Sequence, residues 1–294
     1  MLQKARRRLI IPFLLPAFLL YTVLYAYPIV QTFLWSFTGW SGHTVKRPFT
    51  GLRNYASLLI DGRFHGAMGN TLLYAVLGGV LLFFFGLLLA WGLSQPIRFR
   101  RIFRFIVLAP MVISVAVTGV LWRMIYEPNL GVLNNILRAI NLDQFALPWM
   151  GDTRTALPAI IIASVWWQMG MWVLLILAGI ERIPLDLQDA AKVDGANELQ
   201  VFWHVTLPLL WEVIRTLVVV WIILALQVFG IVLVMSPWGG VSGATQVAAT
   251  YIYYTAFNDF KWGYASAVAS VVLLIIFALS MVSMRAMRRE TIEF

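Results

Sequence analysis

The sequence contains no cysteine, and charged residues make up only 12% of its 294 positions. Without cysteine the chain cannot form a disulfide, a thiolate metal site or a cysteine nucleophile. A soluble globular domain carries about twice this share of charged residues. Apolar residues account for 61% of the chain, an excess that indicates a lipid environment rather than a large water-soluble core.

Groups that carry out chemistry are also missing. The three histidines, His43, His65 and His204, are scattered, and no set of His, Asp and Glu has the spacing of metal ligands. The glycine-rich loop Gly-x-x-x-x-Gly-Lys that cradles phosphates is absent, so we expect the chain not to hydrolyse ATP itself. A membrane-embedded transferase has little support either, because no carboxylate cluster could hold a metal-bound substrate. The chain is therefore expected not to be an enzyme.

Six apolar runs have the length that an α-helix needs to cross a bilayer, roughly 20 residues. The first is too long for the core of a signal peptide, so we expect it to be retained as a membrane helix. Prolines 12 and 16 in the first run and Pro110 in the third are expected to kink their helices. The sequence predicts an all-α membrane protein with about six spans, at residues 9–30, 71–93, 103–126, 156–180, 213–235 and 262–284.

Basic residues gather in three short segments between or beyond these runs. The positive-inside rule places such segments in the cytoplasm, so we expect a multi-pass protein of the inner membrane with both termini cytoplasmic. Residues 1–8 would form the cytoplasmic N-terminus, and residues 9–294 a single transmembrane domain. The same clustering explains the net charge of +9 without nucleic acid as a partner. The segments contain Lys4, Arg6, Arg7 and Arg8; Arg98, Arg100, Arg101 and Arg104; and Arg285, Arg288 and Arg289.

The cytoplasmic segment at residues 181–212 is long, mixed in charge and patterned for helices. Pro184 suits the first turn of a helix, and Gly195 suits the residue that ends one. Pro208 marks the approach to the fifth run. The alanines between these positions would permit close approach by another protein. From the residues alone, an amphipathic loop that only stabilises the bundle is an equally good interpretation.

What favours a docking role is a resemblance to a known family. The segment contains the ordered set Asp189-Ala190-Ala191, Gly195, Val205, Leu207 and Pro208. This set resembles the EAA signature of permease subunits in binding-protein-dependent ABC importers, with Asp189 where the family usually has Glu. Segments 49–55, 131–134 and 263–267 resemble other parts of the sugar-type subunits. The resemblance implies the ABC type I importer fold, in the branch of the maltose and glycerol-3-phosphate permeases.

The resemblance also implies partners and roles. Residues 181–212, called here the EAA loop, would hold a coupling helix that inserts into a separate ATPase. ATP and magnesium would bind to the ATPase dimer, and this chain would bind no cofactor or metal. A second homologous permease and an extracytoplasmic solute-binding protein would complete the importer. The residues expected to couple to the ATPase are Asp189, Ala190, Ala191, Asp194, Gly195, Ala196, Phe202 and Pro208.

Two glutamines lie within the apolar runs, close to aromatic residues. Amide groups and aromatic faces suit the binding of a sugar, oligosaccharide or polyol, and the resemblance places the pathway on these helices. Equally, a membrane glutamine often joins helices. The rival function is an ion-coupled secondary transporter or a channel, but such a carrier usually needs ionisable groups at the middle of its spans. The expected substrate contacts are Trp167, Gln168, Met171, Gln227 and Phe229.

Overall fold

The computed structural model describes residues 2–288. The side chains of residues 2–11, which include the N-terminal basic cluster, and all of residues 289–294, which include Arg289, lie outside this description. Helices make up most of the described chain, and an antiparallel β-bridge joins Thr38 to Phe49. The predicted all-α fold is confirmed.

Five helical stretches among the described residues are long and apolar enough to cross a membrane. A bent pair, α5 (Arg100–Val112) and α6 (Val115–Ile125), makes a sixth if it counts as one span. The predicted number of spans is confirmed, with ends that differ by up to nine residues, at the start of the second span. The five stretches are Pro12–Trp35, α4 (Gly62–Ser94), α8 (Ala156–Ile180), Trp211–Met235 and α15 (Trp262–Ala286).

A π-helical turn interrupts the first span, near the prolines that the sequence singled out. Helix α1 (Leu2–Tyr21) continues through Pro12 and Pro16, and a π-helical turn, η1 (Thr22–Ala26), joins it to α2 (Tyr27–Trp35). This turn lies just before Pro28, whose missing N–H and bulky ring disturb the preceding turn.

The third span bends by 102° after Val112, two residues beyond Pro110. Ile113 takes an extended conformation, and Ser114 caps α6 by accepting a hydrogen bond from the backbone N–H of Val117. A helix stop followed by a capped restart therefore makes this bend, rather than a proline kink.

Two compact units divide the chain. One contains the chain up to Asp61 and residues Ile252–Leu274. It includes α3 (Arg53–Leu59) and the end of α14 (Ala248–Phe257). Here the backbone N–H of Gly263 donates to the carbonyl of Trp40 at 2.9 Å, and the rings of Trp40 and Trp262 lie 5.5 Å apart.

The other unit contains Gly62–Tyr251 and the chain from Ile275 onward. Its core lies among α4, α8 and α12 (Trp211–Leu226), where Trp221 stacks on Tyr74 and meets Trp172 edge to face. The indole N–H of Trp221 donates to the carbonyl of Ala75 at 2.7 Å. In lipid such a polar group must find a protein partner, so this bond orients the ring.

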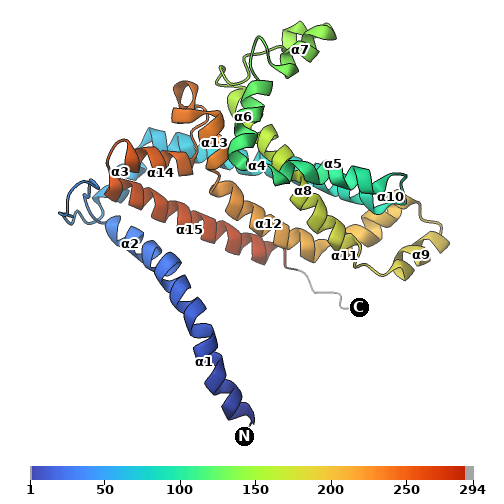
Figure 1. Cartoon of the computed structure of the whole chain (residues 1–294), viewed down its shortest axis with the longest axis horizontal. Helices are drawn as coiled ribbons and strands as arrows, with labels where there is room; N and C mark the ends of the chain where they lie inside the picture. The colour runs from blue at the N-terminus through green and yellow to red at the C-terminus, as the bar shows by residue number, and fades with distance from the viewer. Residues whose placement is uncertain (1, 289–294) are drawn as a thin grey trace. The chain divides into compact units, whose positions relative to one another are not determined.

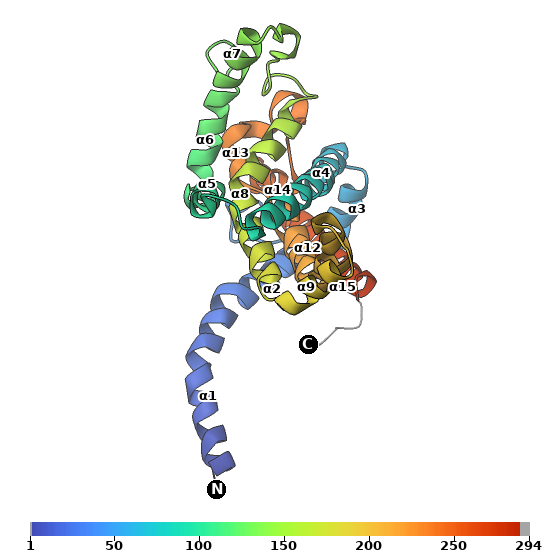
Figure 2. The same ribbon diagram turned by 90° about the vertical axis from the view of Figure 1, so that its right-hand side faces the viewer.

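Short helices occupy the segments between spans of this unit. Helix α7 (Val132–Ala139) precedes α8 and α9 (Leu185–Val193) follows it, and both views show α7 and α9 at opposite ends of α8 (Figures 1 and 2). The remaining short helical pieces here are η2 (Asp143–Phe145), α10 (Glu198–Val201), the π-helical η3 (Phe202–Thr206), α11 (Leu207–Leu209), α13 (Gly230–Met235), η4 (Pro237–Gly239) and η5 (Val241–Gly243).

Candidate functional site

The EAA loop folds as a helix, a tight turn and a second helix. Pro184 is the residue before α9, and Asp186 lies in the first turn, where a negative charge suits the helix dipole. At the other end the N–H of Ala196 bonds to the carbonyl of Ala191, and that of Gly195 bonds to the carbonyl of Lys192, both at 3.0 Å. These two bonds form a Schellman motif, which ends a helix by satisfying its last carbonyl groups.

Gly195 makes this turn possible because its φ is +89°, a left-handed conformation that residues with a Cβ rarely adopt. No atom lies within 4 Å of where a Cβ would stand, so the requirement for glycine comes from the backbone and not from space. The prediction that Gly195 ends the helix is confirmed.

The chain leaves this turn through a capping box, in which Asn197 and Gln200 each bond the other's backbone N–H. Lys192 and Glu198 join the two helices across the turn, with 2.8 Å between Nζ and Oε1. The hydrogen bond to Glu198 raises the pKa of Lys192, which favours the charged form of the lysine. Caps, turn and ion pair together hold residues 185–201 in one shape.

The predicted coupling residues divide into two groups. Asp189, Ala190 and Asp194 are exposed on α9 and the turn, where a partner could reach them. Phe202 is buried, and its ring lies 5.4 Å from that of Trp91 on α4. Phe202 therefore anchors the loop to the bundle. Gly195 and Pro208 are also exposed, and Ala191 and Ala196 are half-buried.

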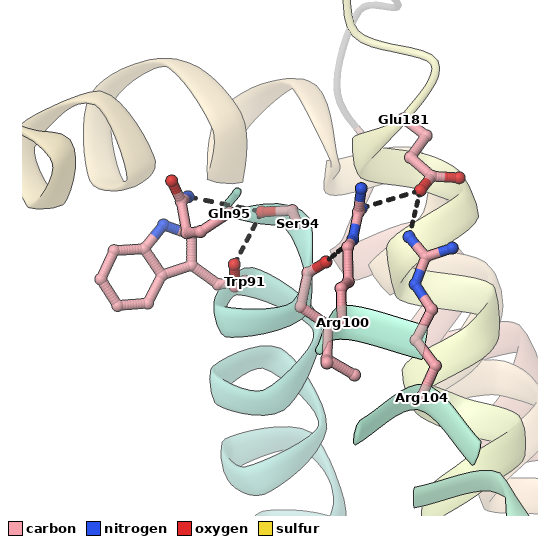
Figure 3. A network of polar contacts seen from close by, with 7 residues as sticks. Trp91, Ser94, Gln95, Arg100, Arg104 and Glu181 are labelled. Carbon is pink, nitrogen blue, oxygen red and sulfur yellow. Dashed lines mark hydrogen bonds and ion pairs between the residues drawn. The ribbon is translucent and has the colours of Figure 1, made fainter. Parts of the chain in front are cut away.

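A cluster of charges fixes the point where α8 enters the EAA loop. Arg100 and Arg104, both on α5, converge on one carboxylate oxygen of Glu181, at 3.1 and 2.5 Å (Figure 3). Arg100 also donates through Nε to the carbonyl of Leu93 at the end of α4. Three helices are thus joined at the base of the loop. The sequence analysis placed these arginines in a basic segment but did not foresee that Glu181 holds both of them.

Two interrupted spans meet beside α8. One interruption is the bend at Ile113 and Ser114, and the other separates α12, which ends at Leu226, from α13, which begins at Gly230. Val115 and Val228 pack against the same cluster of buried residues, which includes Ile231 and Val232. Membrane proteins tolerate non-helical backbone only where protein or a water-filled cavity surrounds it, and transporters use such breaks to hold solutes.

Two of the predicted substrate contacts form hydrogen bonds within the bundle. The indole N–H of Trp167 donates to the carbonyl of Ile113 at 2.8 Å, which satisfies a backbone group freed by the bend. The amide of Gln168 lies 3.4 Å from the carbonyl of Ser164, and the side chains of Gln168 and Ser164 hydrogen-bond the hydroxyl of Tyr74. The sequence analysis did not foresee Tyr74 and Ser164, because a single Tyr or Ser in an apolar run carries no signal of its partner.

The other three predicted contacts differ in position and exposure. Gln227 is exposed at the end of α12, and its amide makes no hydrogen bond within the described residues. Phe229 is half-buried in the same interruption, and Met171 on α8 is 45% exposed. The structure thus brings Gln227 and Phe229 together at one break, whereas Trp167 and Gln168 bond to Ile113 and Ser164.

Comparisons with known proteins agree with this architecture. The probable ABC transporter permease protein YurN of Bacillus subtilis is 38% identical over 275 residues, which cover 93% of this chain and 94% of YurN. The trehalose/maltose transport system permease protein MalF of Thermococcus litoralis is 30% identical, covering 94% of this chain and 93% of MalF.

A bacterial ABC transporter involved in the import of the acidic polysaccharide alginate has the same fold. Its TM-score is 0.86 at 24% identity, and the match covers 99% of both chains. Residues 82–291, which include the EAA loop and both interrupted spans, match the family model described as the binding-protein-dependent transport system inner membrane component. The chain therefore belongs to this family of membrane-embedded permease components of binding-protein-dependent transport systems.

Proposed function

We propose that this chain forms half of the pathway through which an ATP-driven importer moves a sugar, oligosaccharide or polyol. The relatives named for trehalose/maltose transport and for alginate import support a saccharide. A solute-binding protein outside would deliver it, and the family description already implies such a protein. A second homologous permease would form the other half.

The observation that carries the proposal is the shape of the EAA loop. No residue of helix α9 is buried, the helix ends in the Schellman motif at Gly195, and the Lys192–Glu198 pair braces it. Buried Phe202 and the cluster around Glu181 connect it to α4, α5 and α8. A rigid exposed helix attached to several spans can transmit the movement of a partner to the bundle.

The partner would be a dimer of ATPase subunits that bind ATP and magnesium. Closure of that dimer would move the EAA loop and switch the pathway between outward and inward access. This role requires the loop to face the cytoplasm, and with it both chain termini. Helices α7 and α9 lie at opposite ends of α8 (Figures 1 and 2), which agrees with the loops that contain them facing opposite sides of a membrane.

The pathway would run along the break between α12 and α13. Gln227 offers a free amide there, with Phe229 and Met171 as apolar and aromatic surface. Trp167 and Gln168 would support this wall from behind through their bonds to Ile113 and Ser164.

The absence of cysteine makes a direct test of docking simple. Val193→Cys places one thiol at the end of α9, where the valine is 87% exposed. A thiol-specific photo-crosslinker attached there, in membranes that contain the whole importer, is expected to capture the ATPase subunit. Peptide mass spectrometry of the crosslinked band identifies the captured chain.

Val45→Cys provides the matched control, since Val45 is 98% exposed between the first and second spans, and a cytoplasmic N-terminus would place that segment outside. It should capture no ATPase. Equal capture from both positions, or none from position 193 in an assembled importer, would rule out the proposed docking site.

A further inference from the structure

A cavity of about 440 Å³ opens between the start of α12 and the end of α15. This volume is within the range of ligand sites in proteins, about 300–1,000 Å³. Neither the EAA loop nor the break between α12 and α13 contributes to it. Its lining is Arg215, Thr216, Val219 and Val220 on α12, with Met281, Met284, Arg285 and Arg288 on α15.

The two helices align so that the cavity has a charged end and an apolar end. The indole N–H of Trp211 donates to the carbonyl of Met287 at 2.8 Å, which joins the first residue of α12 to the chain just after α15. The helices therefore run in opposite directions with their ends level. Arg215 is then near Arg285 and Arg288, while Val220 and Met281 lie further along the helices.

The charged end has more positive charge than the described residues neutralise. Arg215 pairs with Glu212 at 2.8 Å, whereas no carboxylate within residues 2–288 forms an ion pair with Arg285 or Arg288. Within this described part of the chain, two guanidinium groups therefore lie without a carboxylate partner. Guanidinium is the side-chain group best suited to phosphate, which it binds through two parallel hydrogen bonds.

We infer that this cavity binds the headgroup and upper acyl chain of an anionic phospholipid. Arg285 and Arg288 would hold the phosphate, with Arg215 beside it, and Val219, Val220 and Met281 would contact the first methylene groups of the chain. Basic pockets between membrane helices suit such headgroups. A soluble phosphate would use the arginines but not the apolar end, so the lining favours a lipid. The inference does not depend on the transported solute.

Native mass spectrometry of the full-length chain in mild detergent tests the site, with phosphatidylglycerol as the probe. Zwitterionic phosphatidylcholine and tail-free glycerol phosphate serve as comparison ligands. The double variant Arg285→Gln/Arg288→Gln is expected to lose about thirtyfold in phosphatidylglycerol affinity. Arg98→Gln/Arg101→Gln removes two arginines from another basic segment and should stay within about twofold of wild type.

Two further variants keep the test decisive if the glutamine double variant does not fold. Arg285→Lys/Arg288→Lys retains the charge and should retain most of the binding. Met281→Trp fills the apolar end with the arginines intact, and it should weaken phosphatidylglycerol while leaving glycerol phosphate unchanged.

The inference is overturned if the folded glutamine variant binds phosphatidylglycerol as wild type does. It is equally overturned if phosphatidylcholine or glycerol phosphate binds as tightly as phosphatidylglycerol. Loss of the bound lipid when the second permease assembles would show instead that a protein surface fills the cavity.

Discussion

At the scale of single residues, hydrogen bonds distinguish side chains that look alike in the sequence. Trp167 and Trp122 illustrate the difference. The indole N–H of Trp167 satisfies the carbonyl of Ile113, while that of Trp122 is buried without a partner in the described structure. Sequence offered no way to tell them apart, because both are tryptophans in apolar runs and the partner of Trp167 lies 54 residues away.

Trp167→Phe is expected to destabilise the protein by about 1 kcal/mol, because it leaves a backbone carbonyl at the bend without its donor. Trp122→Phe is the matched control, since it removes an N–H that makes no bond, and it should leave stability unchanged or slightly higher. Thermal unfolding of the purified chain in one detergent measures both. A larger loss for Trp122→Phe than for Trp167→Phe would refute this assignment.

At the scale of helices, hydropathy predicted most of the fold. The six apolar runs became the spans because burying some 20 apolar residues in lipid outweighs local preferences. The bend in the third span escaped prediction, since one capping serine within an apolar run is a weak signal beside Pro110. In the EAA loop Gly195 was a strong signal because few residues adopt its φ of +89°. The ion pairs of Arg100 and Arg104 with Glu181 were not foreseen, because the two arginines lie 81 and 77 residues from Glu181 in the sequence.

The two membrane glutamines have different surroundings, so their substitutions have different expected effects. Gln227 lies at the break between α12 and α13, and Gln168 lies on α8. Gln227→Ala removes a free amide and should lower saccharide uptake about tenfold without lowering thermal stability. Gln168→Ala removes a partner of Tyr74 and Ser164, so it should lower stability as well as uptake. Two measurements distinguish the two variants. One is uptake of the saccharide that the cognate binding protein holds, and the other is the unfolding temperature. Normal uptake by Gln227→Ala would exclude it from the pathway.

At the scale of the whole molecule, the proposed function assigns two different tasks to different elements of the larger unit. The interrupted spans α5–α6 and α12–α13 provide irregular backbone next to α8, where a solute can be held. The EAA loop provides a rigid exposed helix connected to α4, α5 and α8. Within the described spans, the middle of each helix carries no acidic residue or lysine that could couple transport to an ion gradient. The proposal that energy enters through the EAA loop needs no such group.

The most direct test of this account is the ratio of uptake to ATP hydrolysis in proteoliposomes that contain the assembled importer with Gly195→Pro. Proline cannot adopt a φ of +89° and lacks the N–H that bonds to Lys192, so the turn after α9 should be lost. Gly195→Asn tolerates the left-handed conformation and should transport within about threefold of wild type. Gly243→Pro, at another glycine with positive φ, controls for local strain outside the EAA loop.

The account predicts that the Gly195→Pro importer assembles and hydrolyses ATP while uptake per ATP falls about tenfold or more. Both controls should keep a ratio close to wild type. An assembled Gly195→Pro importer with the wild-type ratio of uptake to hydrolysis would contradict the claim that the EAA loop couples the two.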